Sequence, residues 1–228
     1  MEQLIERIQG ISVVEPLYNN DCFVCILLCS FFVLSAVLSS GWKMLEDILS
    51  DFFLPREYAK EGTKTTHALY TRLGMFSVSF MSTALFFAIY VIRRGAFEME
   101  QGCRLALLFF ALLIVIYILK QGLYRMVNWV FFDKAQIVSW RWSYSNWIIL
   151  SGVFMFVISL SSVFFDLSAR ALSILLLLYI VLIEICLFFK AFHIFYAKKY
   201  GVLLLIVYLC TLELMPLLLA GKALVLYL

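Results

Sequence analysis

An all-α fold, a polytopic transmembrane helical bundle, is predicted by composition and by the length and spacing of apolar runs. The 228-residue chain is 64% hydrophobic and only 14% charged, with a mean hydropathy of +0.99. Soluble domains carry roughly 25% charged residues. The 22 Phe, 12 Tyr and 5 Trp suit lipid-facing and interfacial positions. The sequence therefore predicts a membrane protein.

Six apolar runs are candidates for crossing a bilayer, which takes about 17–25 residues of helix. The third is the shortest: its apolar run, 105–119, crosses fully only if the helix begins at Cys103 and Lys120 reaches back to the interface. Without it the chain has five spans. The predicted spans are 22–40, 73–92, 103–120, 147–165, 171–189 and 202–220.

These spans form one membrane domain, 22–220, between an acidic N-terminal segment, 1–21, and a tail, 221–228. The N-terminal segment lacks the basic start of a signal peptide, so we expect the first span to be retained. With six spans, twelve of the 18 Lys and Arg fall on one side of the membrane and six on the other. The positive-inside bias predicts a cytoplasmic side for the twelve and periplasmic termini, although the pair Arg93 and Arg94 opposes it.

Two segments outside the spans are predicted to lie along the membrane surface. In the loop 41–72, apolar side chains such as Trp42, Ile48 and Phe52 share one helical face, and this helix should stop before Pro55. The segment 123–132 has the same amphipathic character and has several tryptophans in or near it. Tryptophans of this kind mark a headgroup boundary.

The sixth predicted span contains an acid and a proline. Glu213 lies near the middle of the span, where an unpaired charge costs at least about 2.5 kcal/mol. Pro216 cannot donate to the carbonyl of Leu212, so an acceptor is left free close to the acid. The pattern fits a kinked structural joint with a shielded, hydrogen-bonded carboxyl, and it also fits a proton or cation site.

A second acid, Glu184, lies in the fifth span, which should pack antiparallel to the sixth. By depth, Tyr179 lies nearest Glu213 and Tyr208 nearest Glu184. Residues five apart on a helix differ in direction by about 140°, so we expect at most one of these tyrosine–glutamate pairs to form.

Cysteines at the outer end of the first span suggest redox chemistry as one alternative. Cys22 and Cys25 have C-x-x-C spacing, and Cys103 is expected on the same side of the membrane. Such thiols could exchange disulfides in an oxidising compartment. Cys29 continues the same stripe into the apolar span, however, which favours simple packing.

Basic residues after the fifth span are candidates for contact with lipid headgroups: Lys190, His193, Lys198 and Lys199. A plain positive-inside anchor explains them equally well. The sequence shows no metal-ligand cluster, no cofactor motif and no catalytic motif, and its small net charge of +3 gives no nucleic-acid footprint. We therefore predict no catalytic residues, no metal and no cofactor.

The stretch FHIFYAKKYGVLLLIVYLCTLELMPLL resembles the C-terminal signature of an uncharacterised family of polytopic inner-membrane proteins from Bacteroidota, similar to domain of unknown function 4271. The resemblance is strongest over 193–218, and Tyr208, Glu213 and Pro216 are among the residues that carry it. It implies a location in the bacterial inner membrane and supplies no activity.

The leading hypothesis is a non-enzymatic subunit or scaffold of a larger cell-envelope complex, linked by analogy to protein export or insertion. Its expected partners are membrane lipids and other integral membrane proteins. The alternatives are a small transporter or proton-coupled device centred on Glu213, and a membrane thiol oxidoreductase using Cys22 and Cys25.

Overall fold

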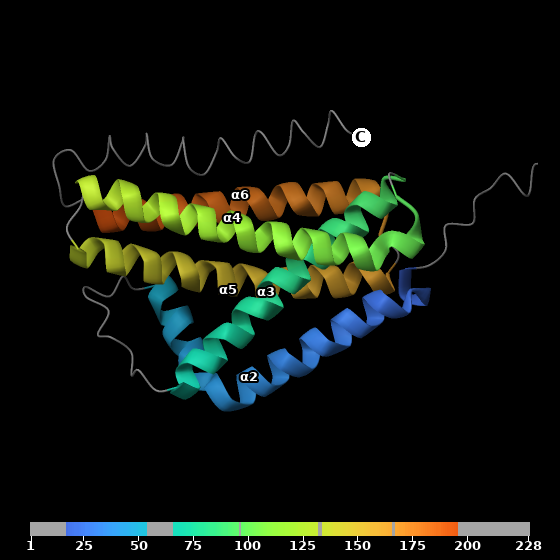
Figure 1. Ribbon diagram of the computed structural model, residues 1–228, viewed down its shortest axis with the longest axis horizontal. Coiled ribbons are helices and arrows are strands. Elements are labelled where there is room, and N and C mark those ends of the chain that lie inside the picture. The colour runs from blue at the N-terminus through green and yellow to red at the C-terminus, as the bar shows by residue number, and fades with distance from the viewer. Residues whose placement is uncertain (1–16, 54–65, 96, 132–133, 166, 196–228) are drawn as a thin grey trace, which may run out of the picture.

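A computed structural model describes residues 17–53, 66–95, 97–131, 134–165 and 167–195, and within these ranges the ordered elements are all helical. Five long helices form an elongated bundle (Figure 1). Short 3₁₀ turns, Leu17–Asn19 and Met99–Gln101, precede two of them. The long helices are α2 (Asp21–Phe53), α3 (Thr66–Arg93), α4 (Gly102–Phe131), α5 (Lys134–Phe164) and α6 (Ala169–Phe195).

Each of the five long helices contains a stretch that is long and apolar enough to cross a membrane. The predicted third span is not cut short at Lys120, because α4 continues unbroken through it. Together with the 3₁₀ turn before it, α4 provides an apolar stretch of 25 residues. The sixth predicted span, 202–220, lies outside the described residues. The five stretches are Asp21–Ser39, Leu69–Arg93, Met99–Leu123, Trp142–Phe164 and Ala169–Phe189.

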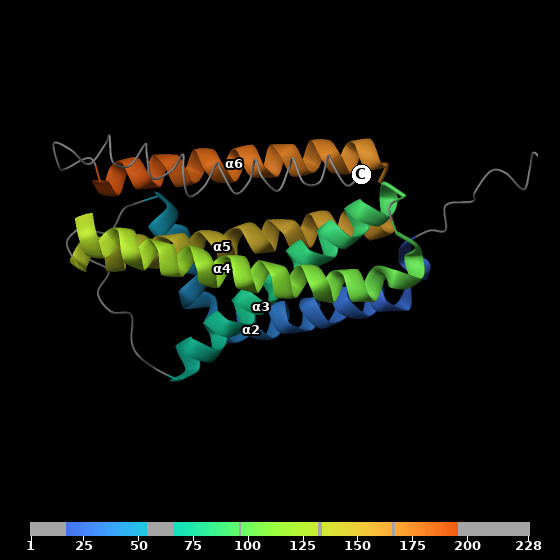
Figure 2. The same ribbon diagram turned by 45° about the horizontal axis from the view of Figure 1, so that its top comes forward.

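Helix α3 is the centre of the bundle. It crosses the other helices diagonally (Figure 1) and contacts α2, α4, α5 and α6. Of its apolar stretch 67% is buried, against 11% for each of α4 and α6, and α6 lies at one side of the bundle (Figure 2). The side chains of Met75, Leu85, Phe86 and Ile89 on α3 are almost completely enclosed.

Small residues let α3 and α5 approach closely. Gly152 of α5 lies directly against Ser79 of α3, and the Ser79 hydroxyl donates across the interface to the carbonyl of Ile149 at 3.2 Å. The Ser159 hydroxyl donates in the opposite direction, to the Ser82 carbonyl at 3.0 Å. Such contacts hold membrane helices together where the hydrophobic effect gives little help.

Both predicted surface segments are continuous with the helices that precede them, and their position along the membrane surface stays a prediction. The first, expected within loop 41–72, is a continuation of α2, which changes direction towards its C-terminal end (Figure 1). It carries a buried Ile48 and an exposed Glu46, as an amphipathic helix should. The helix ends at Phe53, before Pro55. The second segment, 123–132, is no separate piece, since α4 continues through it as far as Phe131.

Candidate functional site

Three members of the predicted acidic site, Glu213, Pro216 and Tyr208, lie outside the described residues. The other two members, Tyr179 and Glu184, are partly buried on α6. Tyr179 packs against the buried core, on the helix α6 that contacts α5 and α3.

The predicted headgroup contacts also lie beyond the described side chains. Lys190 and His193 belong to the end of α6 by their backbone, and Lys198 and Lys199 follow that helix outside the described residues.

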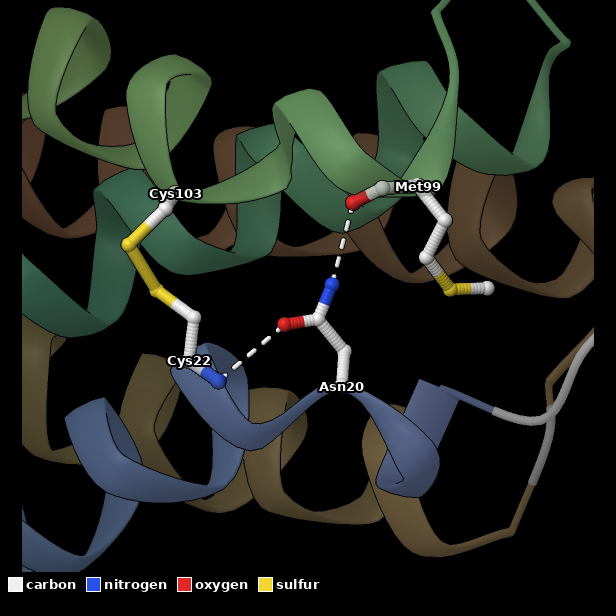
Figure 3. Close-up of a disulfide and its surroundings, with 4 residues drawn as sticks. All are labelled: Asn20, Cys22, Met99 and Cys103. Atoms are coloured by element: carbon white, nitrogen blue, oxygen red, sulfur yellow. Dashed lines mark hydrogen bonds between the residues drawn. A yellow bond between two sulfur atoms is a disulfide. The ribbon is translucent and has the colours of Figure 1, made fainter.

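The cysteines are arranged differently from the predicted C-x-x-C pair. Cys22 forms a disulfide with Cys103, whose Cα lies 5.9 Å away, and this bond joins the start of α2 to the start of α4 (Figure 3). Cys25 and Cys29 are free, exposed thiols on α2. This bond forms because the two helices begin side by side, which brings together cysteines 81 residues apart in sequence, and a redox role for Cys22 and Cys25 stays a prediction.

Asn20 adds a second link between these two helix starts. Its side-chain oxygen accepts a bond from the backbone N–H of Cys22 at 3.1 Å and so caps α2. Its amide nitrogen donates to the carbonyl of Met99 at 3.0 Å, next to the start of α4 (Figure 3). Gly102 belongs to the same joint, since a Cβ there would lie 2.6 Å from the buried Phe23 ring. The starts of α2 and α4 are therefore held together by a disulfide, a hydrogen bond and close packing.

Arg94 also lies at the disulfide end of the bundle, where it connects α3 with α6. Its Nη2 donates to the Tyr90 hydroxyl at 3.0 Å and to the Ser173 hydroxyl at 3.2 Å. Arg94 itself is exposed. Polar contacts of an exposed charge usually stabilise a fold by at most about 1 kcal/mol.

A polar cluster lies at the opposite end of the bundle, around Arg72 of α3. The Arg72 Nη2 donates to the Ser145 hydroxyl at 2.7 Å and to the Asn146 side-chain oxygen at 3.5 Å. Its guanidinium carbon lies 3.8 Å from the centre of the Trp142 ring, a close cation–π contact. Ser145 and Asn146 are buried, whereas Arg72 is only partly buried. The guanidinium of Arg72 is therefore held in position by side chains of α5.

Sequence reasoning missed this cluster because it treated Arg72 as a loop residue just before the second span. The available signal was the run RWSYSNW, 141–147, in which small polar residues alternate with aromatic ones at the start of a span. Polar side chains there need partners once the helix is buried. Arg72 is the partner that the fold supplies.

Among the described residues, no three His, Cys, Asp or Glu side chains come close enough together to hold a metal ion. Two groups in these ranges stand out for their chemistry, the thiols near the disulfide and the Arg72 cluster. The first can exchange disulfide bonds, and the second can bind an anion.

Fold and composition together define a helical, multi-pass membrane protein. The profile of one protein family, Domain of unknown function (DUF4271), matches residues 23–224. The chain belongs to this family. No curated protein and no solved structure matches the chain.

Proposed function

We propose that the protein is a non-enzymatic inner-membrane subunit or scaffold of a larger cell-envelope complex. The observation that carries the proposal is the outer face of α2. This face is exposed and lies within an apolar span. Leu28 and Phe32 lie on it, and the exposed Phe31 and Val33 flank it. Its small side chains are Cys25, Cys29, Ser35, Ala36 and Ser39.

Small residues on an exposed helix face allow another membrane helix to approach closely, which is how helices associate in lipid. Contact with lipid tails does not require small side chains, and the exposed side chains of α4 differ from those of α2 in size. The exposed positions of α4 carry large side chains, including Leu108, Leu112, Val115 and Leu119. The α2 face is therefore suited to another helix and the α4 face to lipid.

The disulfide supports the proposed orientation. Disulfides persist in oxidising compartments such as the bacterial periplasm. Cys22 and Cys103 therefore favour a periplasmic location for the starts of α2 and α4, the same side that the positive-inside bias assigns to the N-terminus.

Replacement of Ala36 by Phe tests the docking face. A bulky ring there should prevent close helix approach and reduce the amount of partner that copurifies in mild detergent by about tenfold, equivalent to about 1.4 kcal/mol. Leu112→Phe on the α4 face is the matched control and should leave copurification unchanged. The identity of the copurified proteins decides whether the complex serves protein export or insertion.

A parent protein that runs as a partner-free monomer at native expression would contradict the scaffold proposal. Equal losses from Ala36→Phe and Leu112→Phe would contradict the assignment to α2.

A second candidate function is thiol–disulfide exchange in the membrane, and the free Cys25 thiol one helical turn from the Cys22–Cys103 disulfide favours it. A Cys25 thiolate would attack Sγ of Cys22, forming a Cys22–Cys25 bond and releasing Cys103 as a thiolate that takes up a proton. A partner protein dithiol would then reduce the new disulfide and become oxidised itself, and a quinone would reoxidise the cysteines.

Exchange with reduced thioredoxin, followed by thiol labelling, tests this candidate. The parent should gain labels on Cys22 and Cys103, and Cys25→Ser should slow that gain at least about tenfold because the attacking thiol is missing. Cys29→Ser, which removes the thiol one turn deeper, should react like the parent. If the Cys22–Cys103 disulfide stayed intact while thioredoxin reduced a reporter disulfide, the bond would have only a structural role.

A further inference from the structure

Among the described residues, Arg72 is a cation that contacts only neutral groups. Ser145, Asn146 and the Trp142 ring hold it in place, and no carboxylate of the described residues contacts it. A charge withdrawn from water into a membrane protein is normally paired, because leaving it alone costs several kcal/mol. The Arg72 charge therefore calls for an anion from outside the described bundle.

The guanidinium still has donors to offer. Arginine carries five N–H groups, of which the two on Nη2 account for the bonds to Ser145 and Asn146. The N–H groups on Nε and Nη1 have no partner among the described residues. Because Arg72 is only partly buried, these donors are accessible from the edge of the bundle.

The position of Arg72 indicates which anion it would meet. Arg72 is three residues from Leu69, where the apolar stretch of α3 begins, and Trp142 is the first residue of the apolar stretch of α5. Both mark the membrane boundary, where lipid phosphates are concentrated. A second cation, Lys120, is near the end of the α4 stretch, with its Nζ 6.0 Å from the centre of the Tyr144 ring.

We propose that Arg72, supported by Ser145, Asn146 and Trp142, binds a phosphate group at this boundary. A planar guanidinium that is already fixed by neighbours suits phosphate, because little side-chain freedom is lost when the anion binds. The source is the headgroup of an anionic phospholipid or free phosphate, and the same donors would serve both. This site is independent of the α2 docking face.

Native mass spectrometry of the detergent-solubilised protein tests the site with phosphatidylglycerol and phosphatidylcholine as probes. The parent should retain phosphatidylglycerol in preference to phosphatidylcholine. Arg72→Gln should bind phosphatidylglycerol about tenfold to a hundredfold more weakly, since charge-assisted hydrogen bonds are lost. Arg125→Gln is the matched control, because Arg125 is an exposed cation on α4 beyond the same boundary, and it should bind like the parent.

Two further measurements keep the proposal testable if Arg72→Gln does not fold. Ser145→Ala removes one support of the guanidinium and should weaken binding a few-fold, as expected for one hydrogen bond. A photoactivatable phosphatidylglycerol added to the parent should crosslink to the peptide that contains Trp142.

Inorganic phosphate, compared with chloride at equal ionic strength, distinguishes the two sources. A thermal shift with phosphate that Arg72→Gln abolishes supports a soluble anion, whereas lipid retention without such a shift supports a headgroup. Equal binding by Arg72→Gln and the parent, equal losses in Arg72→Gln and Arg125→Gln, or no binding of either probe would overturn the proposal.

Discussion

Replacing Cys22 and Cys103 together by serine is expected to lower the free energy of unfolding by about 2–4 kcal/mol. The disulfide joins residues 81 apart and removes loop freedom from the unfolded chain. In a membrane the helices stay inserted when packing is lost, so the loss should lie below the entropy estimate of roughly 4.5 kcal/mol for a free loop of this length. The corresponding thermal shift is about 5–15 °C for a chain of this size.

Thermal unfolding in detergent, with and without reductant, measures this effect. The double serine variant and the reduced parent should melt at similar temperatures, both below the oxidised parent. Cys29→Ser is the control, since Cys29 is a free thiol on the same helix and its loss should leave the midpoint unchanged. A double variant as stable as the oxidised parent would show that Asn20 and the packing around Gly102 hold this end without the disulfide.

Hydropathy was sufficient to predict the helical class and the approximate positions of the first five spans, because crossing a bilayer imposes a minimum apolar length. It did not show that two of the helices continue beyond their spans. Residues 41–53 and 123–131 belong to α2 and α4, although their amphipathic pattern suggested separate surface pieces. An amphipathic pattern reports which face is buried, and it does not report whether the backbone is continuous with the preceding span.

The partners of individual side chains were harder to predict from sequence. Cys22 has a cysteine three residues away, yet its bond goes to Cys103 because α2 and α4 begin side by side. In the sequence, Arg72 contributed only to the count of positive charges on each side of the membrane. Its place beside Trp142 depends on how α3 crosses α5. Local spacing along the sequence carries no information about such tertiary contacts.

The disulfide and the Arg72 cluster lie at opposite ends of α3, the helix that contacts each of the other four. From Arg72 to Arg93 the helix rises about 32 Å, close to the thickness of a bilayer core. Stability of the whole bundle therefore depends on the packing of α3 between these ends, and its closest contact with another helix is with α5.

Substitution of Gly152 tests this packing most directly. A Cβ atom at this position would overlap the Cα and Cβ of Ser79, so α3 and α5 would have to separate. Gly152→Ala is expected to cost about 1–3 kcal/mol, and Gly152→Leu more than about 4 kcal/mol with loss of the bundle, since overpacking cannot be relieved when the obstacle is backbone. The cross-helix bonds to the carbonyls of Ile149 and Ser82 would lengthen in the same step.

Gly122 provides the matched control because it lies on α4 with open space where a Cβ would stand. Gly122→Ala should leave stability unchanged or raise it by at most about 1 kcal/mol through better helix propensity. Unfolding by a denaturing detergent, followed by circular dichroism, compares the two substitutions in one host. If Gly152→Ala matched Gly122→Ala, the close approach of α3 and α5 would not be a source of stability, and the bundle would have to be held by its ends.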